Sequence, residues 1–204
     1  MRINSNRLNK IRYTFYAPIY DGAAKILEHS RARAIQQLAV QQGDKVLIIG
    51  AGTGMDLNYL PKGCQITATD ITPAMVKRID LRNQKMGHHL TTAVMDGQQL
   101  AFPNEKFDVV ILHLILTVIP DPIRTIQEAE RVLKSGGQIS VFDKFVPGNK
   151  TASIIRKAFN VFTNLFFSNI TRSFEPIVAH TRLITVSDKK ANLGGFFRIL
   201  LLRK

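Results

Sequence analysis

The stretch Val46-Leu47-Ile48-Ile49-Gly50-Ala51-Gly52-Thr53-Gly54 decides the fold of this 204-residue chain. Its first four residues are all apolar, as expected for a strand that is buried on both faces of a parallel sheet. The three glycines allow positive φ angles and let a ligand approach the backbone closely. A glycine turn that joins such a strand to a helix is typical of a phosphate or nucleotide site. The spacing G-x-G-x-G differs from the G-x-G-x-x-G of dinucleotide-binding folds.

Strands and helices alternate along the chain around this turn. Apolar runs predict further strands over residues 65–69, 90–95, 107–113, 139–142, 182–186 and 196–202. Helices are expected over residues 23–41, 73–86, 122–134 and 151–170. Two of these helices begin at Thr72-Pro73 and Asp121-Pro122, where a polar cap precedes a proline. The alternation predicts an α/β fold with a parallel sheet covered on both faces, closed by an antiparallel hairpin.

The composition is that of an ordinary globular protein, with 45% hydrophobic residues and a mean hydropathy near zero. The first residues lack the apolar run of a signal peptide, and no stretch reaches the ~20 apolar residues of a membrane span. The single Cys64 excludes an internal disulfide and a cysteine metal cluster. We therefore expect a cytoplasmic protein without a metal site.

The chain has a net charge of +13, and the whole excess of positive over negative charge lies in its two ends. Residues 1–40 carry seven Lys or Arg against two acids, and residues 150–204 carry ten against two. Residues 41–149 carry eleven of each and are neutral. Such basic flanks favour an anionic partner, either a phospholipid surface or nucleic acid. The alternative is a solvated surface that only favours solubility.

Two carboxylates follow the next strands and complete a nucleoside site with the glycine turn. Asp70 ends the second strand, 20 residues after Gly50, where a carboxylate can accept hydrogen bonds from ribose hydroxyls. Asp96 follows the third strand and can accept from the exocyclic amine of adenine. The alternatives are that Asp70 caps the helix that begins at Thr72-Pro73, and that Asp96-Gly97 forms an ordinary turn.

Four segments of the chain resemble successive motifs of the class I S-adenosylmethionine methyltransferases, namely residues 46–54, 68–75, 95–103 and 107–110. The resemblance implies a Rossmann-like sheet of seven strands, mostly parallel, with helices on both faces and an antiparallel last strand. It also implies S-adenosylmethionine as the cofactor. The cofactor residues that it implies are Gly50, Ala51, Gly52, Gly54, Asp70, Ile71, Asp96, Gly97 and His113.

One residue departs from the motif pattern of this family. Ile48 stands where the family usually has Asp or Glu, an acid that helps to organise the glycine turn. Its absence implies weaker cofactor binding or compensation from elsewhere in the chain. A cofactor-binding protein without catalysis therefore stays an alternative to an enzyme.

Within the family, the chain looks most like small bacterial phosphatidylethanolamine N-methyltransferases and quinone-biosynthesis methyltransferases. The segments that carry this resemblance are Tyr16-Ala17-Pro18-Ile19-Tyr20-Asp21, residues 114–122 and Gly194-Gly195-Phe196-Phe197-Arg198. We expect N-methylation of phosphatidylethanolamine, and methylation of a quinone precursor or another amphipathic small molecule is the alternative. RNA is a disfavoured acceptor, because no Asn-Pro-Pro-Tyr motif for exocyclic-amine chemistry is present.

The basic leader fits a lipid acceptor. In its first 16 residues, four cations precede three aromatic residues without an intervening acid: Arg2, Arg7, Lys10 and Arg12, then Tyr13, Phe15 and Tyr16. This pattern suits an interfacial anchor. We expect residues 1–40 to form a helical lid or membrane-surface element and residues 41–204 to form the methyltransferase domain. The protein would then lie peripherally on the inner membrane face.

An ethanolamine nitrogen must be neutral to attack the methyl group, so a proton acceptor is needed. Candidates are Tyr16 and Tyr20, acting from a lid, and His113, which ends the fourth strand. The alternative for His113 is a positioning or core histidine. Arg172 is expected to grip a lipid phosphate, with a plain surface arginine as the alternative.

An aromatic stripe at helical spacing, Phe159, Phe162 and Phe166, has two interpretations. It either lines an acyl groove or packs on the sheet, and packing is favoured. Neither interpretation changes the expected cofactor site.

Overall fold

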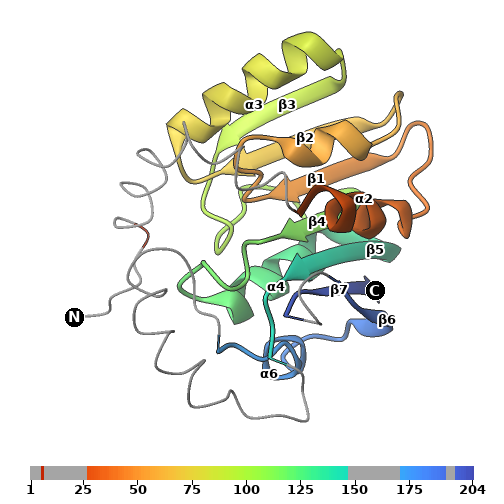
Figure 1. Ribbon diagram of the computed structural model, residues 1–204, viewed down its shortest axis with the longest axis vertical. Helices are drawn as coiled ribbons and strands as arrows, with labels where there is room; N and C mark the ends of the chain where they lie inside the picture. Colours follow the sequence, from red (N-terminus) through yellow and green to blue (C-terminus); the bar gives the residue numbers. More distant parts are fainter. Residues whose placement is uncertain (1–5, 7–26, 147–170, 192–195) are drawn as a thin grey trace.

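The structure is a computed structural model that describes residue 6 and residues 27–146, 171–191 and 196–204. Within these residues, seven strands form one sheet in the order β3-β2-β1-β4-β5-β7-β6 (Figure 1). The strands are β1 (Lys45–Ile49), β2 (Gln65–Asp70), β3 (His89–Val94), β4 (Phe107–His113), β5 (Leu133–Asp143), β6 (Ile184–Lys190) and β7 (Arg198–Arg203). Strands β1 to β5 pair in parallel, and β7 is antiparallel to both of its neighbours. The predicted mostly parallel sheet with an antiparallel last strand is confirmed.

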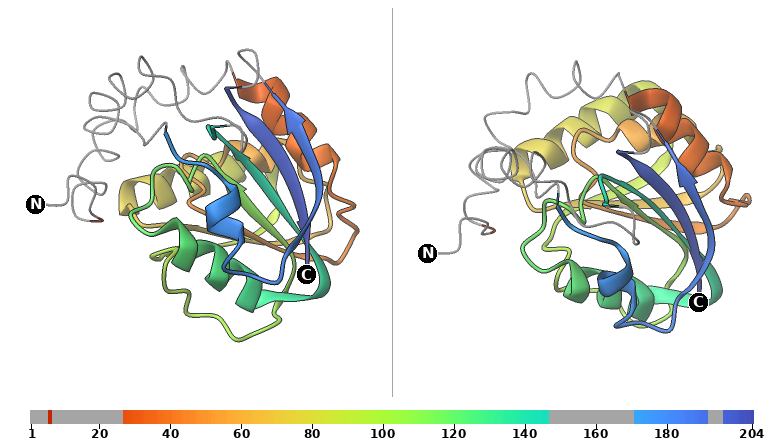
Figure 2. Two further views of the ribbon diagram at one scale, coloured as in Figure 1. Left: turned by 90° about the horizontal axis from the view of Figure 1, so that it is seen from below. Right: turned by 60° about the horizontal axis from the view of Figure 1, so that its bottom comes forward.

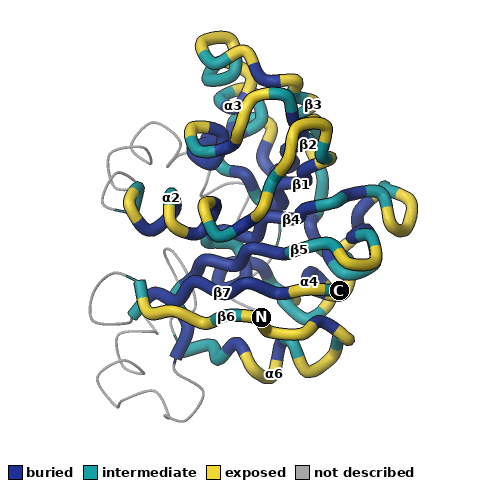
Figure 3. Tube along the Cα trace, turned by 90° about the vertical axis from the view of Figure 1, so that its right-hand side faces the viewer, coloured by how far each residue is buried: buried dark blue, intermediate teal, exposed yellow. Residues whose placement is uncertain are grey.

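The central strands are apolar because both faces of the sheet are covered. Strands β1 and β4 lie side by side, with Val46 in register with Val109 and Ile48 in register with Ile111. All four side chains are buried. Figure 3 shows that burial is concentrated in these strands, whereas the edge strand β6 is largely exposed. The wholly apolar run at the start of the glycine motif thus lies at the centre of the sheet, as its composition predicted.

Helices cover both faces of the sheet (Figure 2). They are α2 (Glu28–Gln36), the short 3-10 helix η2 (Met55–Tyr59), α3 (Pro73–Met86), α4 (Pro122–Val132) and α6 (Glu175–Val178). One core cluster includes Ile35 of α2 and Ile79 of α3, and the other includes Ile126 of α4 and Ile177 of α6. None of the helices in the described ranges is long and apolar enough to cross a membrane.

Several boundaries differ from the sequence prediction. The helix expected after the glycine turn is the five-residue 3-10 helix η2, which ends before Leu60 because Pro61 disfavours helical backbone there. Strand β5 begins at Leu133, six residues before the predicted start, and its register with β4 shifts between Phe107 and Val109. Its first part includes Gly136, which we had expected to end a helix. The helix expected over residues 151–170 lies outside the described residues.

Candidate cofactor site

The glycine turn after β1 is held open by backbone angles that favour glycine. Gly50, Gly52 and Gly54 have φ angles of +67°, +57° and +78°. The backbone N–H of Ala51 donates to the carbonyl of Thr69 at 2.9 Å, so the start of the turn is tied to the end of β2. The turn therefore presents its backbone at the carboxyl edge of the sheet, where parallel sheets bind ligands.

Asp70 ties the turn to the second strand. One of its carboxylate oxygens accepts from the backbone N–H of Gly52 at 2.9 Å, and the other accepts from the N–H of Thr72 at 2.9 Å. Burial raises the pKa of this carboxyl, and these hydrogen bonds only partly oppose the shift. Each oxygen can accept a further hydrogen bond. The bond to the N–H of Thr72 holds Asp70 in the turn before α3, whose N-cap residue is Thr72, and no side chain makes a capping hydrogen bond there.

Asp96 lies at the start of the loop that follows β3. One carboxylate oxygen accepts from the backbone N–H and from the side-chain amide of Gln98, both at 2.9 Å. The other accepts from the carboxamide of Asn6, which reaches this loop from the other end of the sequence. Next to Asp96, a Cβ atom on Gly97 would lie 2.7 Å from the Cγ2 atom of Ile49, so the loop packs on β1 where only glycine fits.

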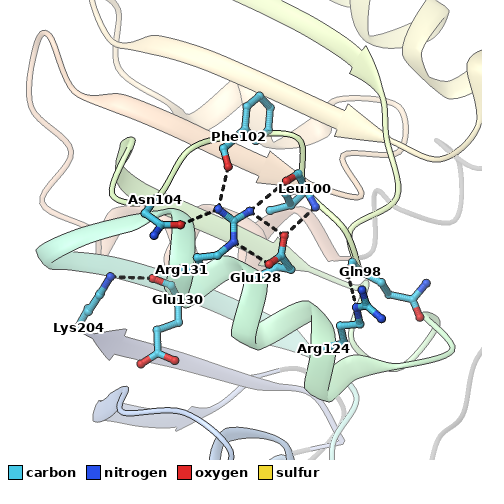
Figure 4. Close-up of polar contacts among 9 residues, drawn as sticks. All are labelled: Gln98, Leu100, Phe102, Asn104, Arg124, Glu128, Glu130, Arg131 and Lys204. Atoms are coloured by element: carbon cyan, nitrogen blue, oxygen red, sulfur yellow. Dashed lines mark hydrogen bonds and ion pairs between the residues drawn. The ribbon is translucent and has the colours of Figure 1, made fainter.

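A network from α4 holds the same loop in place (Figure 4). The guanidinium of Arg131 donates to the carbonyls of Leu100 and Phe102 at 3.0 and 2.8 Å, and its ion pair with Glu128 has an N–O distance of 2.7 Å. Glu128 in turn accepts from the backbone N–H of Leu100 at 2.8 Å. Arg124 donates to the carbonyl of Gln98 at 2.9 Å. The backbone that carries Asp96 is thereby fixed from behind.

These elements line a cavity that is partly open to solvent. Of the predicted cofactor residues, those that line it are Gly50, Gly52, Asp70, Ile71, Asp96 and Gly97. Those that do not line it are Ala51, Gly54 and His113. The apolar remainder of the wall is formed by Ile49, Met75, Met95, Leu114, Ile115, Val118 and Ile119. Asn6 also lines the cavity.

The cavity combines the kinds of groups that an adenosyl ligand needs. Gly52 and Asp96 line it together with the apolar side chains of Met95 and Ile119. Asp70 also lines it, and each of its carboxylate oxygens can accept a further hydrogen bond. Ring faces need apolar walls and amine or hydroxyl donors need carboxylates, and the cavity supplies both.

His113 is buried and does not line this cavity. Its Nδ1 atom is 2.7 Å from an oxygen of Asp56, and its Nε2 atom is 2.9 Å from the hydroxyl of Ser140. Both ring nitrogens are therefore engaged inside the protein. The geometry favours the alternative that we left open, a positioning histidine, over a proton acceptor for the substrate.

Arg172 also turns inward. Its Nη1 atom donates to the carbonyls of Leu116 and Ile119 at 2.6 and 2.7 Å, which ties down the loop after β4. Burial lowers the pKa of this guanidinium. A contact of Arg172 with a lipid phosphate, as predicted from the sequence, would have to replace these hydrogen bonds. The loop that Arg172 holds contributes to the cavity wall.

The remaining predicted positions lie outside the described residues. These are Tyr16 and Tyr20 of the lid, and the aromatic stripe of Phe159, Phe162 and Phe166. Among the residues that the structure describes, no group of His, Cys, Asp or Glu side chains could hold a metal ion.

Known proteins are similar to this chain in sequence and in fold. A family model of the methyltransferase domain matches residues 47–141. The phosphatidylethanolamine N-methyltransferase of Cereibacter sphaeroides is 29% identical over 185 residues, which cover 89% of this chain and 91% of that protein. The demethylmenaquinone methyltransferase of Tropheryma whipplei is 30% identical over 164 residues, which cover 76% of this chain and 68% of that protein.

The fold comparison agrees with the sequence comparison. A putative sarcosine dimethylglycine methyltransferase from Galdieria sulphuraria has a TM-score of 0.72 at 16% identity, covering 90% of this chain and 87% of that chain. A geranyl diphosphate C-methyltransferase from Streptomyces coelicolor has a TM-score of 0.70 at 16% identity, covering 87% and 80%. The chain belongs to the class I S-adenosylmethionine-dependent methyltransferases, as its motifs predicted.

Proposed function

We propose that this methyltransferase methylates the nitrogen of phosphatidylethanolamine at an anionic membrane surface. The observation that carries the proposal is the similarity to a phosphatidylethanolamine N-methyltransferase, which extends over 89% of this chain and 91% of that protein. The charge distribution supports it, because the whole positive excess of +13 lies in the two flanks. A basic flank next to a neutral catalytic core suits an enzyme that must reach a lipid head group.

In this proposal, different cavity residues bind different parts of the cofactor. Asp70 accepts from the ribose hydroxyls, Asp96 accepts from the adenine amine, and the backbone at Gly50 and Gly52 meets the methionine end. When bound, S-adenosylmethionine supplies a methyl group that is already activated on a sulfonium centre. The chain therefore contributes mainly position: it aligns the acceptor nitrogen and excludes water from the reacting atoms.

Proton removal from the acceptor is the one further task of the protein. The ammonium of a head group resembles that of lysine, with a pKa of about 10.4, so only about one molecule in 10³ is neutral at pH 7. The apolar wall around Leu114 and Ile115 favours the neutral amine by desolvation. Since both nitrogens of His113 are engaged, we assign the role of proton acceptor to Tyr16 or Tyr20.

The leader should bind anionic membranes through its charge. Replacing Arg7 and Lys10 by glutamine is expected to weaken binding to anionic vesicles about 30-fold, since each cation near such a surface contributes about 1 kcal/mol. Lys77 and Lys85, which are exposed on α3, provide a matched control with the same loss of charge. Co-sedimentation with vesicles, at low and high salt, measures the effect. Equal losses in the two double variants would exclude a specific role for the leader.

Asn6 should compete with the adenine amine for Asp96. Because its carboxamide donates to the carboxylate oxygen that the proposal assigns to adenine, Asn6→Ala is expected to raise the affinity for S-adenosylhomocysteine. One hydrogen bond of about 1 kcal/mol corresponds to about a fivefold change. Titration calorimetry measures it, with Asn58→Ala, at an exposed position of η2, as the control. Weaker binding by Asn6→Ala would show that Asn6 holds the cofactor instead of opposing it.

A quinone precursor is the second candidate acceptor. The observation that favours it is the 30% identity to a demethylmenaquinone methyltransferase, although the matched region covers only 68% of that protein. Such an acceptor is also amphipathic and would use the same cavity. The two candidates differ in the atom methylated, nitrogen or carbon, so product analysis separates them.

A further inference from the structure

A buried polar cluster lies outside the cofactor cavity, and one of its members follows the glycine turn in the sequence. It consists of Arg31, Asp56, His113 and Ser140, none of which is more than 4% exposed. The four residues come from α2, η2, β4 and β5. The cofactor cavity does not reach them. Charged and polar groups are rarely buried without a role that offsets their desolvation, so the cluster needs an explanation.

Asp56 is the centre of this cluster. One of its oxygens lies 2.8 Å from Nη1 of Arg31 and 2.7 Å from Nδ1 of His113. The chain of contacts continues from Nε2 of His113 to the hydroxyl of Ser140, at 2.9 Å, and from there to the carbonyl of Ala34, at 3.0 Å. Burial alone would raise the pKa of Asp56, but the adjacent Arg31 and His113 outweigh burial and lower it. Asp56 is thus a buried carboxylate that stays ionised.

The position of Asp56 in the sequence connects the cluster to the glycine turn. It follows Gly54 by two residues, and the carbonyl of Gly54 accepts from the backbone N–H of Leu57 at 3.1 Å. The N–H of Gly54 donates to the carbonyl of Ala51 at 2.9 Å. Asp70 fixes the middle of the turn through Gly52, so an anchored Asp56 fixes its exit. Gly50 and Gly52 line the cavity, so Asp56 acts on it through the backbone that follows Gly52.

The cluster also lies on the sheet face to which Ile48 points. Ile48 is in register with Ile111 of β4, and His113 follows Ile111 by two residues, which places its side chain on the same face. Ile48 itself is 1% exposed and packs in the apolar cluster beneath α2. Strand β1 therefore carries no acid, but Asp56 of η2 supplies one on the same face of the sheet, next to the glycine turn.

We propose that Asp56 is a positioning residue for methyl transfer, which holds the glycine turn in its cofactor-binding form through Arg31 and His113. In this role it compensates for the apolar residue at position 48. The proposal rests on the cofactor role of the turn. It also makes α2 a direct support of the cofactor site, because Arg31 lies on α2.

A role in positioning predicts a loss of affinity beyond any loss of stability. Asp56→Asn and Arg31→Met are expected to lower the affinity for S-adenosylhomocysteine by about tenfold or more, as removal of an outer support does at other preorganised sites. The Michaelis constant for S-adenosylmethionine should rise with it. Arg31→Lys, which keeps the charge, should restore most of the affinity. Titration calorimetry well below the unfolding temperature of each variant gives the affinities.

A second buried arginine provides the matched control. Arg198 of β7 is 7% exposed and pairs with Asp188 and Glu175, away from the glycine turn. Arg198→Met should therefore lower the unfolding temperature, as Arg31→Met does, but leave the affinity for S-adenosylhomocysteine within about twofold of wild type. This comparison separates a supporting role from a loss of folding.

The outcomes are distinct. If the variants of Asp56 and Arg31 are less stable but bind S-adenosylhomocysteine like wild type, the cluster is only structural and the proposal is overturned. If Asp56→Asn does not fold, the contrast between Arg31→Lys and Arg31→Met decides in the same way. If wild type itself fails to bind S-adenosylhomocysteine, the cofactor role of the turn fails as well.

Discussion

Replacing Asp70 by Asn is expected to weaken binding of S-adenosylhomocysteine by about 10²-fold. The carboxylate accepts from the N–H groups of Gly52 and Thr72, and the proposal adds the ribose hydroxyls. An amide has only one acceptor oxygen, so one backbone contact and one ribose contact are lost together. Hydrogen bonds to a charged group contribute about 1.5–3 kcal/mol each, which supports a loss of this size.

Asp80→Asn is the control for this prediction. Asp80 is exposed on α3, where it accepts from the hydroxyl of Thr92, and it does not line the cavity. Calorimetric titration of both variants with S-adenosylhomocysteine should show a large loss for Asp70→Asn and none for Asp80→Asn. Unchanged affinity of Asp70→Asn would remove this residue from the cofactor site.

The pKa of Asp70 gives a second reason to assign it a function. Burial raises this pKa, so the ionised carboxylate is less favourable in the folded protein than in the unfolded chain. An acid with a raised pKa contributes its stabilisation at low pH and loses it as the pH rises through the folded value. At neutral pH, Asp70 therefore opposes folding. A residue that costs stability in this way is typical of a ligand site.

Replacing Gly50 by Ala should destabilise the protein more than the same change at Gly87. Both residues have a φ angle of +67°, so a Cβ atom costs about 1–2 kcal/mol at either position. At Gly50 the new atom would also lie 2.6 Å from the Cδ1 atom of Ile115, whereas nothing lies within 4 Å at Gly87. Overpacking adds about 1–3 kcal/mol, which gives a total loss of about 2–5 kcal/mol for Gly50→Ala.

Chemical denaturation of the two variants measures this difference. Gly50→Ala should also abolish detectable binding of S-adenosylhomocysteine, because Gly50 and Ile115 both line the cavity. Gly87→Ala should bind normally, since Gly87 ends α3 away from the site. An equal loss of stability in the two variants would show that Ile115 moves aside without cost.

The part of the fold that the sequence predicted is the part with local signals. Strand β1 and strand β4 are apolar on both faces, and their runs identify them without any knowledge of their neighbours. The start of β5 could not be predicted in this way, because residues 134–138 are polar or glycine and include Gly136 with a φ angle of +78°. The edge strand β6 is largely exposed, so burial leaves little pattern in its sequence.

The cofactor site follows the same rule. The glycine turn, Asp70 and Asp96 each follow a strand directly, so their place at the carboxyl edge of the sheet could be predicted from the order of elements. The contact of Asn6 with Asp96 spans 90 residues and has no such signal. The hydrogen bond of His113 with Asp56 spans 57 residues and depends on the packing of η2 beneath the sheet. Sequence spacing placed His113 at the end of β4 but left open whether its ring meets the ligand or is engaged in the interior, and the contacts with Asp56 and Ser140 favour the interior.

The central claim, that phosphatidylethanolamine accepts the methyl group, can be measured directly. Purified protein should be incubated with S-adenosylmethionine labelled in the methyl group, in parallel with a total lipid extract, a quinone precursor and total RNA. The proposal predicts label in the phospholipid fraction, as N-methylated phosphatidylethanolamine, with stronger labelling on anionic vesicles. Label confined to the quinone precursor or to RNA, with none in phospholipid, would contradict it.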